Sequence, residues 1–150
     1  MLFLLNLFAR KPKTEIVLFA GLEGVICFRG EPAKGAEVKL VVKWDPVKPE
    51  TCSVVTDERG WFSLERKTSF YRPTSLARTM VSQRVTVNYY EQEFLIWSLT
   101  SSDGILPEDN LFEKNTITCE LTDEIKRYSC GRLGVNTNCQ WSEMPDAENF

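Results

Sequence analysis

The stretch from Leu22 to Leu64 constrains the fold of this chain more than any other part, because apolar and polar residues alternate along it. In the run AEVKLVVK (36–43), most apolar residues fall on one face of an extended chain and the charged residues fall mostly on the other. A period of two is the spacing of a half-buried β-strand. Gly30, Pro32, Asp57 and Gly60 supply turn signals between the runs. The stretch therefore predicts three or four β-strands joined by turns.

Two runs within this stretch, GVICFRGEPAKGAEVKL (24–40) and TDERGWFSL (56–64), carry a family resemblance. They resemble the transthyretin-like, or carboxypeptidase regulatory-like, superfamily of small β-sandwiches. The resemblance implies an all-β fold, a single Greek-key β-sandwich of about seven or eight strands. The hairpin from Arg84 to Leu99 and the cysteine-bearing tail are similar to a small stand-alone bacterial branch of that superfamily. Members of that branch are expected to have an Asn-Gly turn where this chain has Tyr90-Glu91-Gln92, so the tightness of the hairpin stays open.

The domain organisation follows from length and composition. A chain of 150 residues with 43% hydrophobic content can bury a core without metal or disulfide staples. We expect an apolar and basic arm at 1–14, one sandwich domain at 15–141, and a frayed acidic tail at 142–150. A short helix fits either 68–82 or 107–113, and a long inter-strand loop fits the first segment equally well.

The N-terminus, MLFLLNLFARKPK, is apolar up to Phe8. Its basic residues follow the apolar run, whereas a secretory signal places them before it. The run is also too short for stable membrane insertion, since a spanning helix needs about 20 residues. A strand or ordered arm is therefore favoured over a cleaved signal or an interfacial anchor. The expected compartment is the cytoplasm, with the periplasm as the alternative.

Five cysteines make an odd number, which argues against a complete disulfide framework. Cys27 and Cys52 lie in strand-like contexts and are expected to be small buried hydrophobes. The spacing of Cys119, Cys130 and Cys139 differs from that of structural zinc sites, so no metal site is predicted. A Cys130–Cys139 bridge stays open, although a reducing cytoplasm opposes it.

The chain contains no histidine, which excludes Ser-His and Cys-His nucleophile pairs and histidine zinc sites. The hydroxyisourate hydrolase branch of the resembled superfamily depends on histidines, so that activity is excluded as well. The adjacent carboxylates at 57–58, 108–109 and 123–124 are interpreted as turn or loop residues rather than acid/base pairs. We therefore predict a protein that is not an enzyme, without catalytic residues or cofactors. Trp44, Trp61 and Trp97 are expected in the core rather than stacked on sugars.

Charge is polarised along the chain. No acidic residue lies between Arg66 and Tyr90, whereas 103–124 is acidic, and the net charge of −3 gives no drive toward nucleic acid. Arginine and aromatic residues are typical of protein-interface anchors, although a solvated loop explains this segment equally well. The predicted partner-binding residues are Phe70, Tyr71, Arg72, Arg78 and Arg84.

These observations favour a protein-binding β-sandwich without enzymatic activity. Its sharpest form is a bacterial immunity protein that neutralises a cognate toxin delivered by a type VI-like secretion system. The alternative is an envelope or surface accessory domain that binds carbohydrate or another structural protein. A homodimer through an exposed edge strand stays open.

Overall fold

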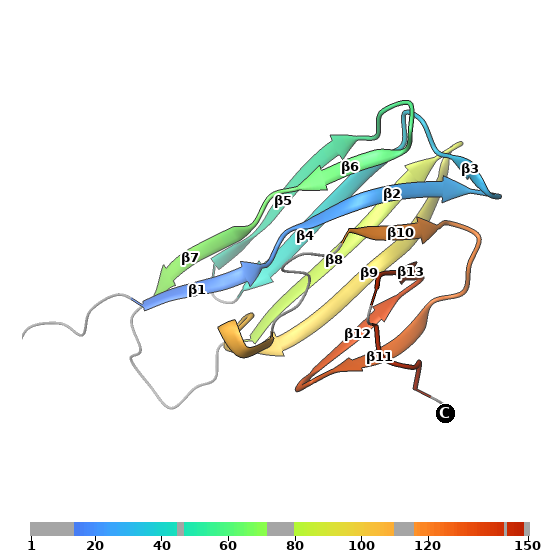
Figure 1. The fold of residues 1–150 in the computed structure, drawn as a ribbon. Coiled ribbons are helices and arrows are strands. Elements are labelled where there is room, and N and C mark those ends of the chain that lie inside the picture. The colour runs from blue at the N-terminus through green and yellow to red at the C-terminus, as the bar shows by residue number, and fades with distance from the viewer. Residues whose placement is uncertain (1–13, 45–46, 72–79, 110–115, 143, 149–150) are drawn as a thin grey trace, which may run out of the picture.

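The computed structural model describes residues 14–44, 47–71, 80–109, 116–142 and 144–148 (Figure 1). Within these ranges the chain forms thirteen β-strands in three sheets, one 3-10 turn and no α-helix. The predicted all-β class is therefore confirmed. The predicted number of seven or eight strands is too small. Segments outside the stretch with clear alternation and turn signals also form paired strands. The architecture resembles a β-sandwich with additional strands at both ends of the chain.

The strands follow one another along the whole described chain. They are β1 (Thr14–Phe19), β2 (Leu22–Phe28), β3 (Glu31–Pro32), β4 (Glu37–Trp44), β5 (Val47–Val55), β6 (Trp61–Leu64), β7 (Lys67–Tyr71), β8 (Met80–Tyr89), β9 (Gln92–Ser102), β10 (Ile117–Glu120), β11 (Lys126–Cys130), β12 (Leu133–Thr137) and β13 (Cys139–Gln140). The 3-10 turn η1 spans Pro107–Asp109.

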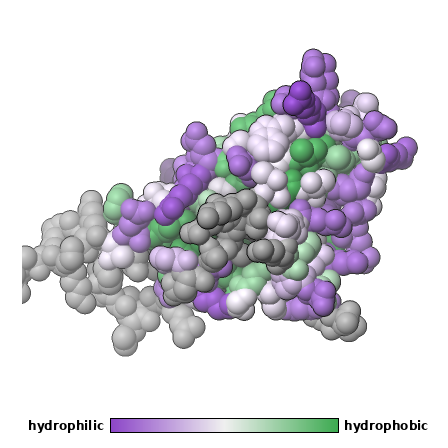
Figure 2. Space-filling model, in the orientation of Figure 1, coloured by the Kyte–Doolittle hydropathy of each residue, from purple (hydrophilic) through white to green (hydrophobic). Residues whose placement is uncertain are grey.

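The strands form two layers (Figure 1). One layer is the six-stranded sheet β11-β12-β9-β8-β4-β5, and the other is the five-stranded sheet β13-β10-β2-β3, in which β6 also pairs with β2. The two-stranded sheet β1-β7 continues the β2–β6 pair along the second layer. Figure 2 shows the outside of this second layer as a mosaic of hydrophilic residues with smaller hydrophobic areas between them. Both layers therefore turn their apolar faces toward one shared core.

The core confirms the alternation seen in the sequence. Ala36, Val38, Leu40 and Val42 are all at most 2% exposed. Other strands of both sheets contribute Leu22, Ile26, Val85, Val87, Ile96, Leu99 and Ile117. Burying side chains of this size stabilises the fold by roughly 1.5–3 kcal/mol each before entropy is counted. Packing between the two sheets is thus the main source of stability.

The tryptophans follow the predicted pattern in two of three positions. Trp44 and Trp97 are buried, as expected. Trp61 is 36% exposed, so its predicted place in the core is wrong. Its neighbours in β6, Phe62 and Leu64, point inward, and alternation along a strand therefore places Trp61 on the outer face.

Two glycines show how tightly the second layer is built. A Cβ on Gly24 would lie 1.9 Å from the carbonyl oxygen of Ile117, because β2 and β10 run side by side in parallel. Gly60 has a φ of +77° in the turn before β6. In that turn, the Asp57 carboxylate accepts hydrogen bonds from the backbone N–H groups of Arg59 and Trp61 at 2.9 and 3.0 Å. This is the turn that the sequence predicts.

A disulfide joins Cys119 in β10 to Cys139 in β13. The two residues are opposite each other in the antiparallel pair, and both are fully buried. Cys130 is a free thiol in β11, which belongs to the other sheet, so the Cys130–Cys139 pairing left open by the sequence is wrong. Sequence spacing does not show that β13 returns to β10. Cys27 and Cys52 are free and only partly buried.

The two segments proposed for a short helix have different outcomes. Residues 68–71 belong to strand β7, and 72–79 lie outside the described residues. In the second segment, Pro107–Asp109 forms the 3-10 turn, and 110–115 lie outside the described residues. The carboxylate of Asp109 accepts a hydrogen bond from the N–H of Leu106 at 2.7 Å and pairs with Arg132 at 2.7 Å. These contacts attach the turn to the β11–β12 hairpin.

The ends of the chain differ in how much the structure describes. The predicted arm, 1–14, lies outside the described residues up to position 13, and β1 begins at Thr14. Within the segment predicted as a tail, Ala147 forms an antiparallel bridge with Tyr128 of β11. Among the described residues, no helix is long and apolar enough to cross a membrane.

Candidate functional site

Two tight turns lie at the same end of the sandwich, on the right in Figure 1. Arg29 and Gly30 join β2 to β3 with φ values of +52° and +81°, and Tyr90 and Glu91 join β8 to β9 with φ values of +49° and +60°. Positive φ at both central residues is characteristic of the type I′ turn, which favours Asn-Gly. The β8–β9 hairpin is therefore tight, although neither central residue is glycine.

Tyr90 and Glu91 hold this backbone conformation at a cost. The left-handed conformation costs a residue with a Cβ roughly 1–2 kcal/mol. Strain of this kind is concentrated at functional sites, where the surrounding structure compensates for it. The turn therefore marks this end of the sandwich as a candidate site, and the side chains it presents identify its chemistry.

Aromatic side chains from both turns contact one another. The ring of Phe28 lies 5.5 Å from that of Tyr89, 6.0 Å from Tyr90 and 6.0 Å from Phe94, measured between centroids. The Arg29 guanidinium lies 5.1 Å from the centroid of the Phe28 ring, in cation–π geometry. We call these five residues, Phe28, Arg29, Tyr89, Tyr90 and Phe94, the aromatic end.

The aromatic end combines a buried base with an exposed tip. Phe28, Tyr89 and Phe94 are partly buried and pack against the core. Tyr90 is 73% exposed, and its ring lies 4.4 Å from that of Tyr89. A side-chain hydrogen bond with Tyr90 raises the pKa of Tyr89, and burial raises it further. An exposed tyrosine on a packed aromatic base is a large contact surface with little conformational entropy to lose.

Glu120, at the end of β10, holds the β2–β3 turn in place. Its carboxylate accepts hydrogen bonds from the N–H groups of Arg29 at 3.1 Å and Gly30 at 2.6 Å. It also accepts from the N–H and hydroxyl of Thr122 at 3.0 and 2.8 Å. Burial raises the pKa of Glu120, but the hydrogen bonds to Thr122, Gly30 and Arg29 outweigh this effect and lower its pKa. The position of Arg29 therefore depends on a carboxylate that is far away in the sequence.

The residues predicted to bind a partner are not gathered in one place by the described structure. Phe70 is 59% exposed on β7, opposite Glu15 of the two-stranded sheet. Arg84 is exposed in the middle of β8, in the six-stranded sheet. Tyr71 ends β7, and its side chain is not described, while Arg72 and Arg78 lie outside the described residues. Their predicted role stays a prediction.

The aromatic end was missed at the sequence level although one signal for it is present. Tyr90-Glu91 stands where a hairpin of this kind favours Asn-Gly, and such a departure indicates that something other than turn stability selects the residues. Nothing in the sequence shows that Phe28 comes to lie beside Tyr90. That neighbourhood depends on how the two sheets pack.

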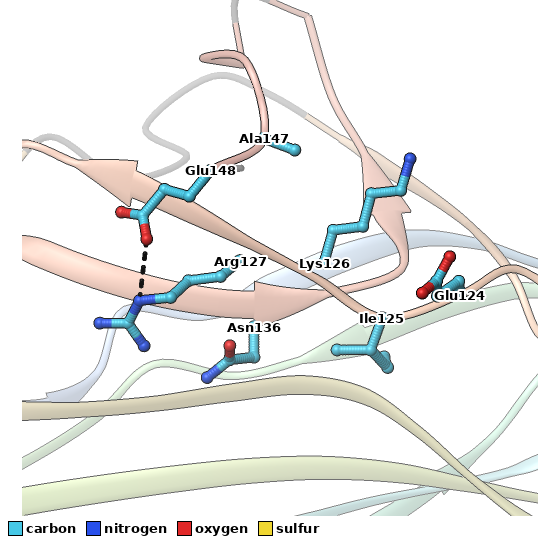
Figure 3. A pocket seen from close by; sticks show the side chains of 7 residues that line it. All are labelled: Glu124, Ile125, Lys126, Arg127, Asn136, Ala147 and Glu148. Atoms are coloured by element: carbon cyan, nitrogen blue, oxygen red, sulfur yellow. Dashed lines mark ion pairs between the residues drawn. The ribbon is translucent and has the colours of Figure 1, made fainter. Parts of the chain in front are cut away.

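A second feature is a polar pocket of about 380 Å³ beside β11 (Figure 3). Its lining is Glu124, Ile125, Lys126, Arg127, Asn136, Ala147 and Glu148. Across it, the Arg127 Nε lies 3.3 Å from the Glu148 carboxylate. Both side chains of this ion pair are partly exposed to solvent. The described residues of the lining include carboxylates and cations, and none of them is a serine, cysteine or histidine. Among the described residues, no group of three or more potential ligand side chains can hold a metal ion.

A family model described as "Domain of unknown function (DUF6795)" matches residues 22–124. The chain belongs to this family. The DUF6795 domain extends from β2 to just beyond β10 and includes all five residues of the aromatic end as well as Glu120. Strands β1, β11, β12 and β13 lie outside the matched range. No curated protein and no solved structure matches the chain.

Proposed function

We propose that this chain is a protein-binding β-sandwich without enzymatic activity, and that the aromatic end is its binding surface. The observation that carries the proposal is the exposed Tyr90 ring, which a strained turn holds against the rings of Phe28 and Tyr89. Tyrosine and arginine are enriched among the residues that dominate binding energy at interfaces. A natural sequence that keeps a costly turn in place of Asn-Gly retains the side chains for another purpose.

The sharpest form of this proposal is an immunity protein that binds and neutralises a cognate secreted toxin. The resemblance to a stand-alone bacterial branch of the transthyretin-like superfamily supports it, as does the small size of the domain. Such an inhibitor needs one rigid anchor for slow dissociation and charge complementarity for fast association. Tyr90 on its aromatic base supplies the anchor, and the Arg29 guanidinium supplies a positive charge that no described acidic residue pairs within 4 Å.

The experiment is co-expression with the product of a neighbouring gene, combined with a binding measurement on the purified pair. Rescue from toxicity and a stable complex are expected for the native chain. Tyr90→Asn keeps a residue that tolerates positive φ but removes the ring, and we expect about 30-fold weaker binding, equivalent to about 2 kcal/mol. Phe70→Ala is the matched control, because it removes another exposed aromatic ring from a different sheet. Loss of binding in Phe70→Ala but not in Tyr90→Asn would move the surface to the segment that the sequence first indicated.

An envelope or surface accessory domain is the second candidate function, and one observation favours it. The buried Cys119–Cys139 disulfide is typical of oxidising compartments such as the bacterial periplasm. This favours the periplasm over the cytoplasm. A periplasmic location is also compatible with an immunity protein that acts against a periplasmic toxin. Cell fractionation separates the compartments, and binding to a carbohydrate or envelope protein in place of a toxin would select the accessory domain.

A further inference from the structure

The edge strand β11 carries a second inference, separate from the aromatic end. β11 is the last strand of the six-stranded sheet, and only β12 pairs with it within that sheet. On its other side, the C-terminal segment of the chain is seated against it. Ala147 forms an antiparallel bridge with Tyr128, and the N–H of Glu148 donates to the carbonyl of Arg127 at 2.8 Å. The edge therefore already accepts an extended segment.

The side chains show which chemistry this edge selects. The Glu148 carboxylate pairs with the Arg127 guanidinium at 3.3 Å and accepts a hydrogen bond from the Ser129 hydroxyl. Lys126 adds a second positive charge at the rim of the pocket (Figure 3). The seated segment, 144–148, contains Asp146 and Glu148 and no basic residue. The edge is thus complementary to an extended segment that carries carboxylates.

The Arg127 side chain lies across the neighbouring strand of the sheet. The guanidinium lies directly over Gly134 of β12, so closely that a Cβ there would be 2.1 Å from one of its nitrogens. A larger residue at this position would have to displace the guanidinium. The cation therefore lies against the sheet surface, next to the edge, where a carboxylate of a paired strand can reach it.

The C-terminal segment makes few contacts with β11. These contacts include one described bridge, one partly exposed ion pair and the Ser129 contact, and exposed ion pairs contribute little to stability. The pocket of about 380 Å³ stays open between this segment and β11–β12. A longer strand pairing along all of Lys126–Cys130 would make more backbone hydrogen bonds and place side chains in this pocket.

We propose that β11 is a strand-capture site for an extended acidic segment of a partner protein, and that residues 144–148 occupy it until such a segment replaces them. Binding then requires release of the chain's own tail, which lowers the apparent affinity by the fraction of molecules in which the edge is free. The inference goes beyond the aromatic end and does not depend on it.

The test uses the full chain and a fluorescein-labelled peptide, MPDAENF, which copies residues 144–150, with anisotropy as the readout. In Glu148→Arg the tail is repelled by Arg127, so we expect the peptide to bind at least tenfold more tightly than to the native chain. Adding Arg127→Glu to this variant should abolish the gain. Glu50→Arg makes the same charge change on the opposite edge strand, β5, and is expected to bind the peptide like the native chain.

Hydrogen exchange gives a second readout that does not depend on affinity alone. Bound peptide should protect the amides of 127–129 and leave those of β5 unchanged. Equal peptide binding by Glu148→Arg and the native chain would overturn the proposal, as would protection confined to β5. A dimer that exchanges tails at micromolar concentration would also overturn it, because the occupant would then be a second copy of this chain.

Discussion

Removal of the Cys119–Cys139 disulfide tests how the fold is held together. The bond links residues separated by 20 positions and joins β10 to β13. In the chain-entropy model, closing a loop of about 20 residues removes about 11 cal/mol/K from the unfolded state, which is about 3.3 kcal/mol at 25 °C. We expect the double variant Cys119→Ala/Cys139→Ala to lose at least this much free energy of unfolding.

The loss is large enough to measure by urea denaturation. With an m value of about 2 kcal/mol/M, the midpoint should fall by about 1.5 M urea. For a domain of this size, the melting temperature should fall by roughly 7–13 °C. Mild reduction of the native chain, with the thiols then blocked, should have the same direction of effect.

Cys130→Ala is the matched control, because it removes a partly buried thiol and leaves the disulfide intact. Its midpoint should stay within about 0.5 M urea of the native value, in keeping with the small loss from one truncated side chain. A double variant that unfolds at the native midpoint would refute the reasoning, as would peptide mapping that finds Cys130 bonded to Cys139.

Three further perturbations test the turns and the close approach of β2 to β10. Replacing Tyr90-Glu91 by Asn-Gly should raise the free energy of unfolding by about 1–2 kcal/mol, because the type I′ turn then carries its preferred residues, while partner binding falls; unchanged thermal stability would contradict the strain. Gly24→Ala should lower the melting temperature by more than 10 °C or prevent folding, since its Cβ would meet the Ile117 carbonyl oxygen. Gly30→Ala is the control, because its Cβ would meet nothing within 4 Å, and it should lower the free energy of unfolding by only about 1 kcal/mol. Glu120 has a folded-state pKa lowered below its usual value of 4.5, so its contribution is complete above that value and is lost as pH falls through the lowered pKa. Glu120→Gln should therefore have a lower melting temperature than the native chain at pH 7, and its melting temperature should fall less between pH 7 and pH 3. An equal fall in both proteins would disprove this role of Glu120.

The comparison of sequence and structure separates local from distant effects. The alternation in 36–43 correctly predicted which side chains enter the core, because a strand's pleat alone determines which residues share a face. The Asp57 turn was equally predictable, since its hydrogen bonds reach only two and four residues along the chain. The outward place of Trp61 was not predictable in this way, because its size favoured burial while its register in β6 turned it outward.

The candidate site depended on pairings that no local pattern contains. Glu120 caps a turn about ninety residues earlier in the chain, and it reaches that turn because β10 lies parallel to β2. Likewise, Cys139 bonds to Cys119 because β13 returns to β10 after the chain has passed through the other sheet. The sequence had only left a bridge from Cys130 to Cys139 open. The predicted set around Phe70 relied on composition, which says nothing about which side chains meet.

The sequence by itself determined that this chain forms strands, where several of them turn, and that histidine chemistry is absent, because these properties depend on neighbouring residues and on composition. Only the tertiary structure decided that Phe28, Arg29 and Tyr90 form one surface and that the tail lies on β11. The physical reason is that sheet packing and edge pairing bring together residues whose separation along the chain carries no local signal of contact.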